Sequence, residues 1–425
     1  PMKPYIQTLA SIIEKQTLRG HQSARRLLNA AYSWVRFSSG YSRKPGVRSA
    51  YDRMNAAVAG TLVDSFRRPK QAVMVNIFFP CEMIHALGLQ PMFPEGLSAY
   101  LACTACQHVF SQAAEDAGVP ESFCSYHKTL LGAGLTGVMP APLLIANTTL
   151  ACDANQLSFR QLAGQYQVPH VAIDVPDQVN EDAVGYVADQ LRQVTAQMEA
   201  LSGRKLSEDA LAAAVDRSRR TIQAQRAFLA VRGQVSLNTT MTGELCSLIA
   251  NHVMLGRPEA EEYLQRLLSC AKAAPPPDRG RRRVFWMHTL PNWQDSMKDL
   301  LEGDRCELVG TDLAIDYLGE MDPEHPYESM ARRVVYSINN GPAQRRIQAS
   351  LETALQAGAE GVIVFCHWGC KQTMGLSQLA KTTFEAHGLP TLVLDGDGCD
   401  SRNVADGQMS TRVSAFLEQL EGTAP

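Results

Sequence analysis

Four of the eleven cysteines stand where a thiolate could face a ligand. In doubly wound sheets, ligands bind beyond the carboxyl ends of the strands. Cys152 follows one predicted strand, Cys366 and Cys370 flank the end of another, and Cys124 lies between the first two strands predicted for the first unit. Their spacings match no compact ferredoxin or zinc finger. Thiolates that converge without a nearby histidine base favour a cluster over cysteine nucleophilic catalysis, which needs an oriented acid–base partner.

Three further motifs are better explained by turns and packing than by ligand binding. Cys103 and Cys106 form a CxxC pair, but no second pair follows, so we expect two cysteines on one buried helical turn. The glycine-rich stretch 131–137 has no preceding strand and is predicted to be a turn. Residues 395–400 (DGDGCD) resemble the start of a calcium loop without its terminal glutamate, and a strand precedes them. We predict a strand-end turn there that faces the cleft.

The elements that must position these residues follow from hydrophobic patterning. Short apolar, β-branched runs predict strands at 71–80, 143–149, 168–174, 283–287, 306–311, 361–366 and 391–395. Helical patterns separate most of them, and such alternation is typical of parallel sheets covered on both faces. The predicted fold class is therefore α/β, with two doubly wound parallel-sheet units, Rossmann- or flavodoxin-like, and added helical segments.

The same patterning divides the chain into four parts. Residues 1–65 are predicted to be an N-terminal helical segment, and 66–180 a first α/β domain that contains Cys124 and Cys152. Residues 181–275 carry long amphipathic helical patterns without a convincing strand. A proline-rich linker at 273–280 then precedes a second α/β domain at 281–425, which contains Cys370.

Composition bounds the possible functions. Of 425 residues, 45% are hydrophobic and 20% are charged, which excludes a disordered, collagen-like or coiled-coil protein. A net charge of −3 gives no general basic surface, so nucleic-acid binding is not expected. No apolar run reaches the ~20 residues of a membrane helix, and the N-terminus has no secretion signal. Together with an odd number of cysteines in a large chain, this predicts a cytoplasmic protein with free thiols and no membrane partner.

Around these cysteines the chain resembles the 2-hydroxyacyl-CoA dehydratase and benzoyl-CoA reductase family. The resemblance runs from about residue 70 to the C-terminus. It consists of Phe79-Pro80-Cys81-Glu82, Phe123-Cys124-Ser125-Tyr126, Cys152-Asp153 followed by a helix, the stretch 361–371, and the ending 407–413.

This resemblance implies a [4Fe–4S] cluster held by Cys124, Cys152 and Cys370, with Cys366 as the less favoured rival for the third position. One iron would stay open for water or a substrate oxygen, much as a catalytic zinc keeps an open position. Cys81 is a further option as a fourth ligand, as in an electron-relay subunit. Members of the family that carry a double cluster need more cysteines than we can match, so a single cluster is expected.

The resemblance also implies the reaction and the partners. An ATP-dependent activator protein would inject one electron, and the cluster would pass it to the carbonyl of a 2-hydroxyacyl-CoA thioester. The resulting ketyl radical anion would expel the neighbouring hydroxyl. The chain would then be one subunit of this hydro-lyase, paired with a related subunit in a heterodimer or with itself in a homodimer. Alternatives are a subunit of an ATP-dependent reductase of the benzoyl-CoA type and a cluster-free partner subunit. Glu82, Ser125 and His367 are the candidate catalytic residues.

Overall fold

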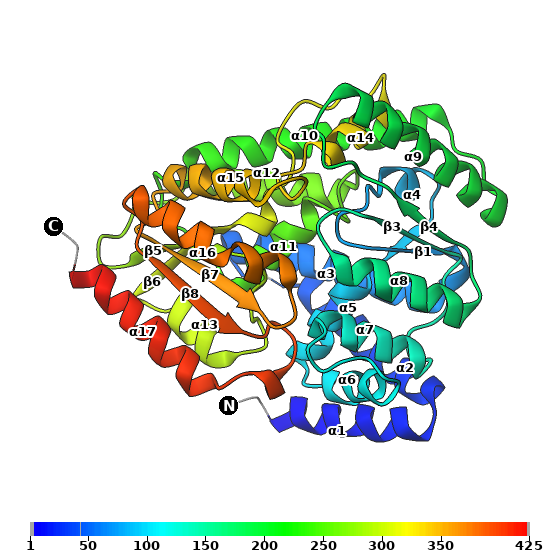
Figure 1. Ribbon diagram of the computed structural model, residues 1–425, viewed down its shortest axis with the longest axis horizontal. Coiled ribbons are helices and arrows are strands. Elements are labelled where there is room, and N and C mark those ends of the chain that lie inside the picture. The colour runs from blue at the N-terminus through cyan, green and yellow to red at the C-terminus, as the bar shows by residue number, and fades with distance from the viewer. Residues whose placement is uncertain (1–3, 43, 423–425) are drawn as a thin grey trace.

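The computed structural model describes residues 4–42 and 44–422 and contains two four-stranded sheets. Their strand orders are β2-β1-β3-β4 and β6-β5-β7-β8, and every pairing is parallel. In Figure 1 the β5–β8 sheet lies on the left and the first sheet on the right, with helices around both. The predicted α/β class with two doubly wound units is confirmed.

The first sheet contains β1 (Ala72–Val75), β2 (Gln90–Met92), β3 (Leu144–Thr148) and β4 (His170–Ile173). Every residue of β1 and β3 is buried, as expected for central strands of a sheet covered on both faces. The predicted strand 71–80 is too long, because the chain leaves the sheet after Val75 and enters helix α4 at Glu82. Strand β2 was not predicted, because three residues with a central proline carry no strand pattern.

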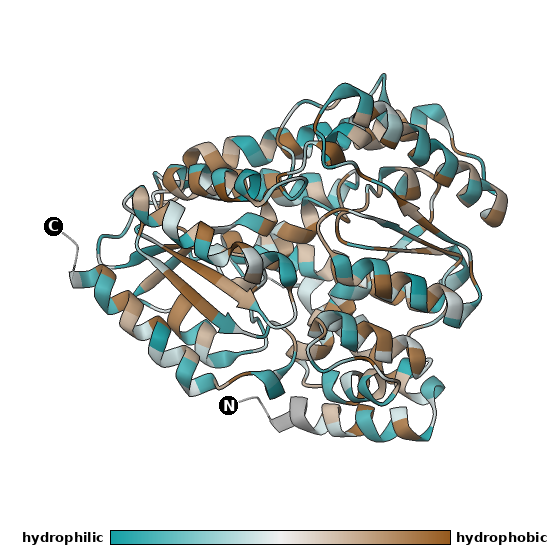
Figure 2. Ribbon diagram, in the orientation of Figure 1, coloured by the Kyte–Doolittle hydropathy of each residue, from teal (hydrophilic) through white to brown (hydrophobic). Residues whose placement is uncertain are grey.

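The second sheet contains β5 (Arg282–Met287), β6 (Cys306–Thr311), β7 (Gly361–His367) and β8 (Thr391–Gly396). All four strands were predicted to within about two residues at each end. Strands β5 and β7 are buried along their whole length. Strands of this sheet are brown, that is hydrophobic, over much of their length in Figure 2, and such apolar runs are what predicts a strand from the sequence.

Helices surround the sheets and also fill the regions between them. The N-terminal helices are α1 (Pro4–Arg19), α2 (His21–Gly40) and α3 (Val47–Arg67). Within the first unit lie η1 (Pro69–Gln71), α4 (Glu82–Ala86), α5 (Pro94–Cys103), α6 (Gln107–Asp116), α7 (Ser125–Leu135) and α8 (Asp153–Tyr166). The long helical stretch comprises α9 (Glu181–Ser202), α10 (Glu208–Arg232), α11 (Met241–Ala250) and α12 (Pro258–Lys272).

The second unit adds α13 (Asp295–Leu301), η2 (Asp312–Ala314), α14 (Pro326–Val335), α15 (Ala343–Gln356), α16 (Lys371–Ala386), η3 (Ser401–Asn403) and α17 (Asp406–Gly422). Helix α14 was not predicted, and it packs away from its own sheet. Its buried residues Met330 and Val334 join the hydrophobic core of the first unit together with Val73 and Val187. Helix α14 of the second unit therefore packs into the core of the first unit and joins the two. No helix in the described residues is long and apolar enough to span a membrane.

Two motif predictions are corrected by the helices. The glycine-rich stretch 131–137 is not a turn but mostly the second half of α7. A Cβ on Gly132 would lie 1.7 Å from the carbonyl oxygen of Phe110, so glycine allows α7 to pack directly on α6. Cys103 and Cys106 do not share a helical turn either, because Cys103 ends α5 and Cys106 precedes α6.

Candidate functional site

A cavity of about 490 Å³ lies where the carboxyl ends of the two sheets meet. Both sheets reverse their strand order between the two central strands, β1 and β3 in one and β5 and β7 in the other. The segments after all four central strands contribute lining residues, among them Phe78, Cys152, His288 and Cys370. Such reversal points are the usual ligand sites of doubly wound sheets. In this protein the reversal points of both sheets face the same cavity.

Cys124, Cys152 and Cys370 all line this cavity. Each residue is also the N-cap of a helix, with α7, α8 and α16 beginning at the next residue. A helix N-terminus carries a partial positive charge and free N–H groups, which favour a nearby anion. Three cysteines far apart in the sequence thus meet at three helix N-termini.

Burial and mutual proximity affect the protonation of these cysteines. Burial raises the pKa of Cys124 well above its ordinary value, and the neighbouring Cys152 and Cys370 raise it further. Burial also raises the pKa of Cys152 to about 12, while the N–H groups of Asn155 and Ala154 act in the opposite direction. Without a cation Cys124 and Cys152 are therefore thiols, and a bound metal centre would have to displace their protons.

The loop that precedes Cys370 packs directly on the backbone of Cys124. Gly369 has a φ of +76°, and a Cβ there would lie 2.5 Å from the Cys124 nitrogen and 2.7 Å from the carbonyl carbon of Phe123. Only a residue without a side chain permits this approach. Gly369 therefore fixes a cysteine of the first unit beside a cysteine of the second.

The two less favoured cysteines lie elsewhere. Cys366 is within β7 and does not line the cavity, and Cys81 is fully buried with its sulfur 3.3 Å from the carbonyl oxygen of Phe79. This placement supports Cys370 over Cys366 as the third cysteine of the cavity. It gives no support to Cys81 as a fourth ligand.

Of the three candidate catalytic residues, only His367 lines the cavity. Glu82 is fully buried at the start of α4, where it accepts a hydrogen bond from Ser218 (2.9 Å) and lies 3.6 Å from Arg333. Ser125 is also buried and donates its hydroxyl proton to Asp397 Oδ1 at 2.6 Å. Both residues hold the fold together, and neither reaches the cavity.

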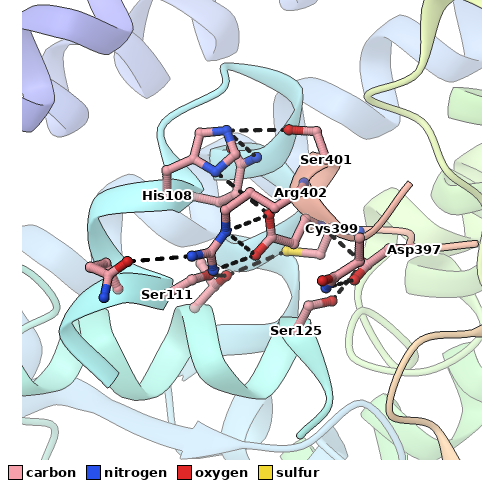
Figure 3. Close-up of polar contacts among 12 residues, drawn as sticks. His108, Ser111, Ser125, Asp397, Cys399, Ser401 and Arg402 are labelled. Carbon is pink, nitrogen blue, oxygen red and sulfur yellow. Dashed lines mark hydrogen bonds and ion pairs between the residues drawn. The ribbon is translucent and has the colours of Figure 1, made fainter. Parts of the chain in front are cut away.

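Ser125 belongs to a polar network around the loop that follows β8 (Figure 3). Asp397 Oδ1 also accepts the N–H groups of Cys399 and Asp400, and Asp400 pairs with Arg402 at 2.7 Å. Protein donors therefore occupy the carboxylates of Asp397 and Asp400. The chain turns directly after β8, as predicted, but none of residues 395–400 lines the cavity, so the expectation that this turn faces the cleft is wrong. This turn anchors α7 of the first unit to the second sheet.

Glu95 is a cavity residue that sequence reasoning missed. It lies in the first turn of α5, where one carboxylate oxygen accepts the N–H of Ile77 at 3.3 Å. The other oxygen is buried and has no hydrogen-bond partner among the described residues. Burial raises the pKa of Glu95 to about 8. The only signal in the sequence is a Pro-Glu pair that opens a helix after the unpredicted strand β2.

His288 is a second missed residue. It follows β5 and has a φ of +87°, which is rare for a residue with a side chain and often marks a functional position. Asp312 accepts the His288 N–H at 2.6 Å and also pairs with Arg346 at 2.7 Å. Arg346 and His288 both line the cavity, so this cluster adds a cation and an imidazole to it.

No group of three or more His, Cys, Asp or Glu side chains within residues 4–42 and 44–422 surrounds a single metal position. A mononuclear site like that of zinc is therefore not built in this part of the chain. In a [4Fe–4S] cluster each thiolate binds a different iron, so the sulfurs surround the cluster and do not converge on one point. Three cysteine side chains that line one cavity are donors of the kind that such a cluster uses.

Comparison with known proteins identifies relatives of this chain. The chain is 24% identical over 381 residues to the lactoyl-CoA dehydratase subunit alpha of Anaerotignum propionicum, which covers 80% of this chain and 89% of that protein. It is 22% identical over 475 residues to the (R)-2-hydroxyglutaryl-CoA dehydratase subunit alpha of Acidaminococcus fermentans, with 89% and 97% covered. A beta subunit also matches, that of the (R)-phenyllactyl-CoA dehydratase of Clostridium sporogenes, at 23% identity over 318 residues, with 71% and 81% covered.

The family model described as 2-hydroxyglutaryl-CoA dehydratase, D-component, matches residues 76–420. That range contains the three cavity cysteines, the residues that hold them in place and every strand except β1. The chain therefore belongs to the 2-hydroxyacyl-CoA dehydratase family.

Proposed function

We propose that this chain is the [4Fe–4S]-binding subunit of a 2-hydroxyacyl-CoA dehydratase, with Cys124, Cys152 and Cys370 as the protein ligands. The observation that carries the proposal is the meeting of these three thiols at three helix N-termini around one cavity, in a chain of the dehydratase family. When bound, a cluster with three protein thiolates supplies single-electron chemistry and one iron without a protein ligand.

The cavity walls provide the surroundings that such chemistry needs. Phe78, Phe93, Leu245 and Ile249 line the cavity and make this part of its wall apolar. A dry site strengthens electrostatic interactions and protects a radical from side reactions. The positive ends of α7, α8 and α16 favour the thiolate form of the three cysteines.

In the proposed reaction the substrate is a 2-hydroxyacyl-CoA thioester. One electron from an ATP-dependent activator reduces the thioester to a ketyl radical anion, the bond to the neighbouring hydroxyl breaks, and after loss of a proton the electron is returned. The net reaction releases one molecule of water, so a group in the cavity must supply a proton to the hydroxyl and remove one from the adjacent carbon.

Glu95 is the group that we assign to this proton transfer. Its Oε2 atom has no hydrogen-bond partner in the described part of the chain, and burial raises its pKa to about 8. An acid with a pKa near the working pH can both donate and accept a proton efficiently. Glu95 would give its proton to the departing hydroxyl and then take one from the substrate carbon.

We further propose that the active enzyme is a heterodimer with a related subunit, in the cytoplasm. Both an alpha and a beta subunit of known dehydratases resemble this chain, which supports pairing between related chains. All eleven cysteines are free thiols in the structure, which fits a reducing compartment.

Anaerobic reconstitution with iron and sulfide tests the cluster assignment directly. Cys124→Ser, Cys152→Ser and Cys370→Ser should each lose most of the iron and the visible absorption of the cluster. Cys103→Ser, in the same cavity, and Cys270→Ser, on α12, should retain both. Fewer than about one iron per wild-type chain would overturn the proposal. Loss of iron in Cys366→Ser but not in Cys370→Ser would reassign the third ligand.

Activity is tested with the loaded protein, a related subunit, an activator with ATP, and a panel of 2-hydroxyacyl-CoA thioesters. Catalytic dehydration after a substoichiometric supply of electrons is the expected result. Consumption of electrons in proportion to product would indicate a reductase instead.

A further inference from the structure

Two buried histidines contact two of the cavity cysteines, so the expectation that these cysteines converge without a nearby histidine is wrong. His367 Nε2 lies 3.4 Å from Cys124 Sγ, and His127 Nε2 lies 3.6 Å from Cys152 Sγ. A neutral imidazole has one N–H and one lone pair, so each contact is either a donation to sulfur or an acceptance from it. The partner of the other ring nitrogen, Nδ1, decides which one it is.

The Nδ1 atom of His367 must carry the lone pair. The backbone N–H of Gly398 donates to this nitrogen at 3.0 Å, and a donor cannot face a second N–H. The ring proton is therefore on Nε2, which points to Cys124. Ser125 Oγ lies 3.5 Å from the same nitrogen, a long distance for an oxygen acceptor but not for sulfur.

Asp397 offers an alternative that the geometry excludes. Its Oδ1 lies 3.6 Å from His367 Nδ1, which could suggest an Asp–His pair with the proton on Nδ1. That oxygen already accepts three shorter hydrogen bonds, from Ser125 Oγ (2.6 Å) and from the N–H groups of Cys399 (2.7 Å) and Asp400 (2.8 Å). It needs no fourth donor, so His367 keeps the tautomer set by Gly398.

The tautomer of His127 is the opposite one. Ser158 Oγ donates its only proton to the carbonyl oxygen of Ala154 at 2.7 Å, because a carbonyl can only accept. The 2.7 Å contact between Ser158 Oγ and His127 Nδ1 is therefore a donation from the histidine. Nε2 of His127 then has the lone pair and can accept the thiol proton of Cys152.

We infer that His367 is a fixed N–H donor to the Cys124 sulfur and tunes the redox potential of the centre that this cysteine binds. The inference rests on the proposed cluster and deepens it. A hydrogen bond to a ligand sulfur stabilises the more electron-rich, reduced state and raises the reduction potential. His127 contacts Cys152 at a similar distance but supplies no donor, so it serves as a natural comparison.

The tautomers can be measured in the cluster-free protein. Nitrogen-15 NMR of labelled histidines distinguishes the two ring nitrogens, and His367→Gln and His127→Gln spectra assign the two signals among the ten histidines. We expect a proton on Nε2 of His367 and on Nδ1 of His127. A proton on Nδ1 of His367, or on both of its nitrogens near neutral pH, would overturn the inference whether or not a cluster binds.

The effect on potential is measured by redox titration of the reconstituted protein, followed by electron paramagnetic resonance. His367→Leu removes the donor and should shift the midpoint potential to a more negative value. His367→Gln keeps an N–H near the position of Nε2 and should return the potential toward that of the wild type. His127→Leu should cause no comparable negative shift.

Equal midpoint potentials for His367→Leu and His367→Gln would refute the role of the hydrogen bond. A purely structural effect of replacing His367 would not depend on whether the new side chain carries an N–H donor. Circular dichroism of each variant establishes that it is folded, and the glutamine variant keeps the test decisive if the leucine variant does not fold. A wild-type chain that takes up no iron would overturn the proposed function, whereas the NMR result would still decide the tautomers.

Discussion

Gly369→Ala should disrupt the contact that holds the two halves of the cysteine site together. An alanine at φ +76° costs about 1–2 kcal/mol, because the Cβ meets its own backbone. Its Cβ would also lie 2.5 Å from the Cys124 nitrogen and 2.7 Å from the Cys124 Cα. Moving packed atoms out of such an overlap costs a further ~1–3 kcal/mol. The expected total is about 2–5 kcal/mol of unfolding free energy.

Two other glycines separate these contributions. Gly388 has a φ of +79°, and a Cβ added there would have no atom within 4 Å, so Gly388→Ala should cost only the conformational part, about 1–2 kcal/mol. Gly375 lies inside α16 in open space without a positive φ, so Gly375→Ala should be neutral or stabilising by up to ~1 kcal/mol.

The assay is urea unfolding of the cluster-free proteins by circular dichroism, followed by iron content after anaerobic reconstitution. Gly369→Ala should show the lowest midpoint and the lowest iron content, while the other two variants bind iron like the wild type. If Gly369→Ala loses no more stability than Gly388→Ala and keeps its iron, the close approach of this loop to Cys124 is not what assembles the site.

Two further predictions concern buried charges. Glu307 is 1% exposed and accepts hydrogen bonds from Arg232 (2.9 Å) and Arg283 (3.4 Å), so Glu307→Ala should lower the free energy of unfolding by about 3–5 kcal/mol. Glu421→Ala, at an exposed pair with Arg305, should leave the urea midpoint almost unchanged. Equal losses of stability in the two variants would contradict the buried role of Glu307. The pKa of Glu95 is raised from 4.5 to about 8, so the folded chain keeps a proton that the unfolded chain releases in this range, and stability should fall as pH rises through it. Glu95→Gln should remove this loss of stability with rising pH. If the urea midpoints of the wild type and the variant change with pH in the same way between about pH 5 and 8, Glu95 is not desolvated.

The strands of both sheets were predictable where the local pattern is strong. A continuous apolar run such as 361–366 must be buried on both faces, and β7 follows it closely. Strand β2 has no such pattern because its pairing partner β1, not its own residues, makes it a strand. Helix α14 was missed although its 10 residues are amphipathic, and its apolar face is covered by the other unit.

The candidate site shows the same division. Cys152 and Cys370 could be placed at strand ends, because a position directly after a strand can be read from the order of residues in the chain. The role of Glu82 could not be predicted, since its partners Ser218 and Arg333 come from distant helices. Glu95 was missed for a related reason: nothing in its neighbouring residues reveals that one oxygen is buried without a partner among the described residues.

Local patterns in the chain were enough to establish the α/β class, most strands and four cysteines to be considered, because burial, strand length and position relative to a strand are properties of short segments. The choice of Cys124, Cys152 and Cys370 among the four came from the family resemblance. Long-range packing established that these cysteines share one cavity, that Cys366 and Cys81 do not line it, and which way each histidine presents its proton. Those properties depend on contacts between distant segments, such as that of Cys124 with His367, 243 positions apart, and no local pattern encodes them.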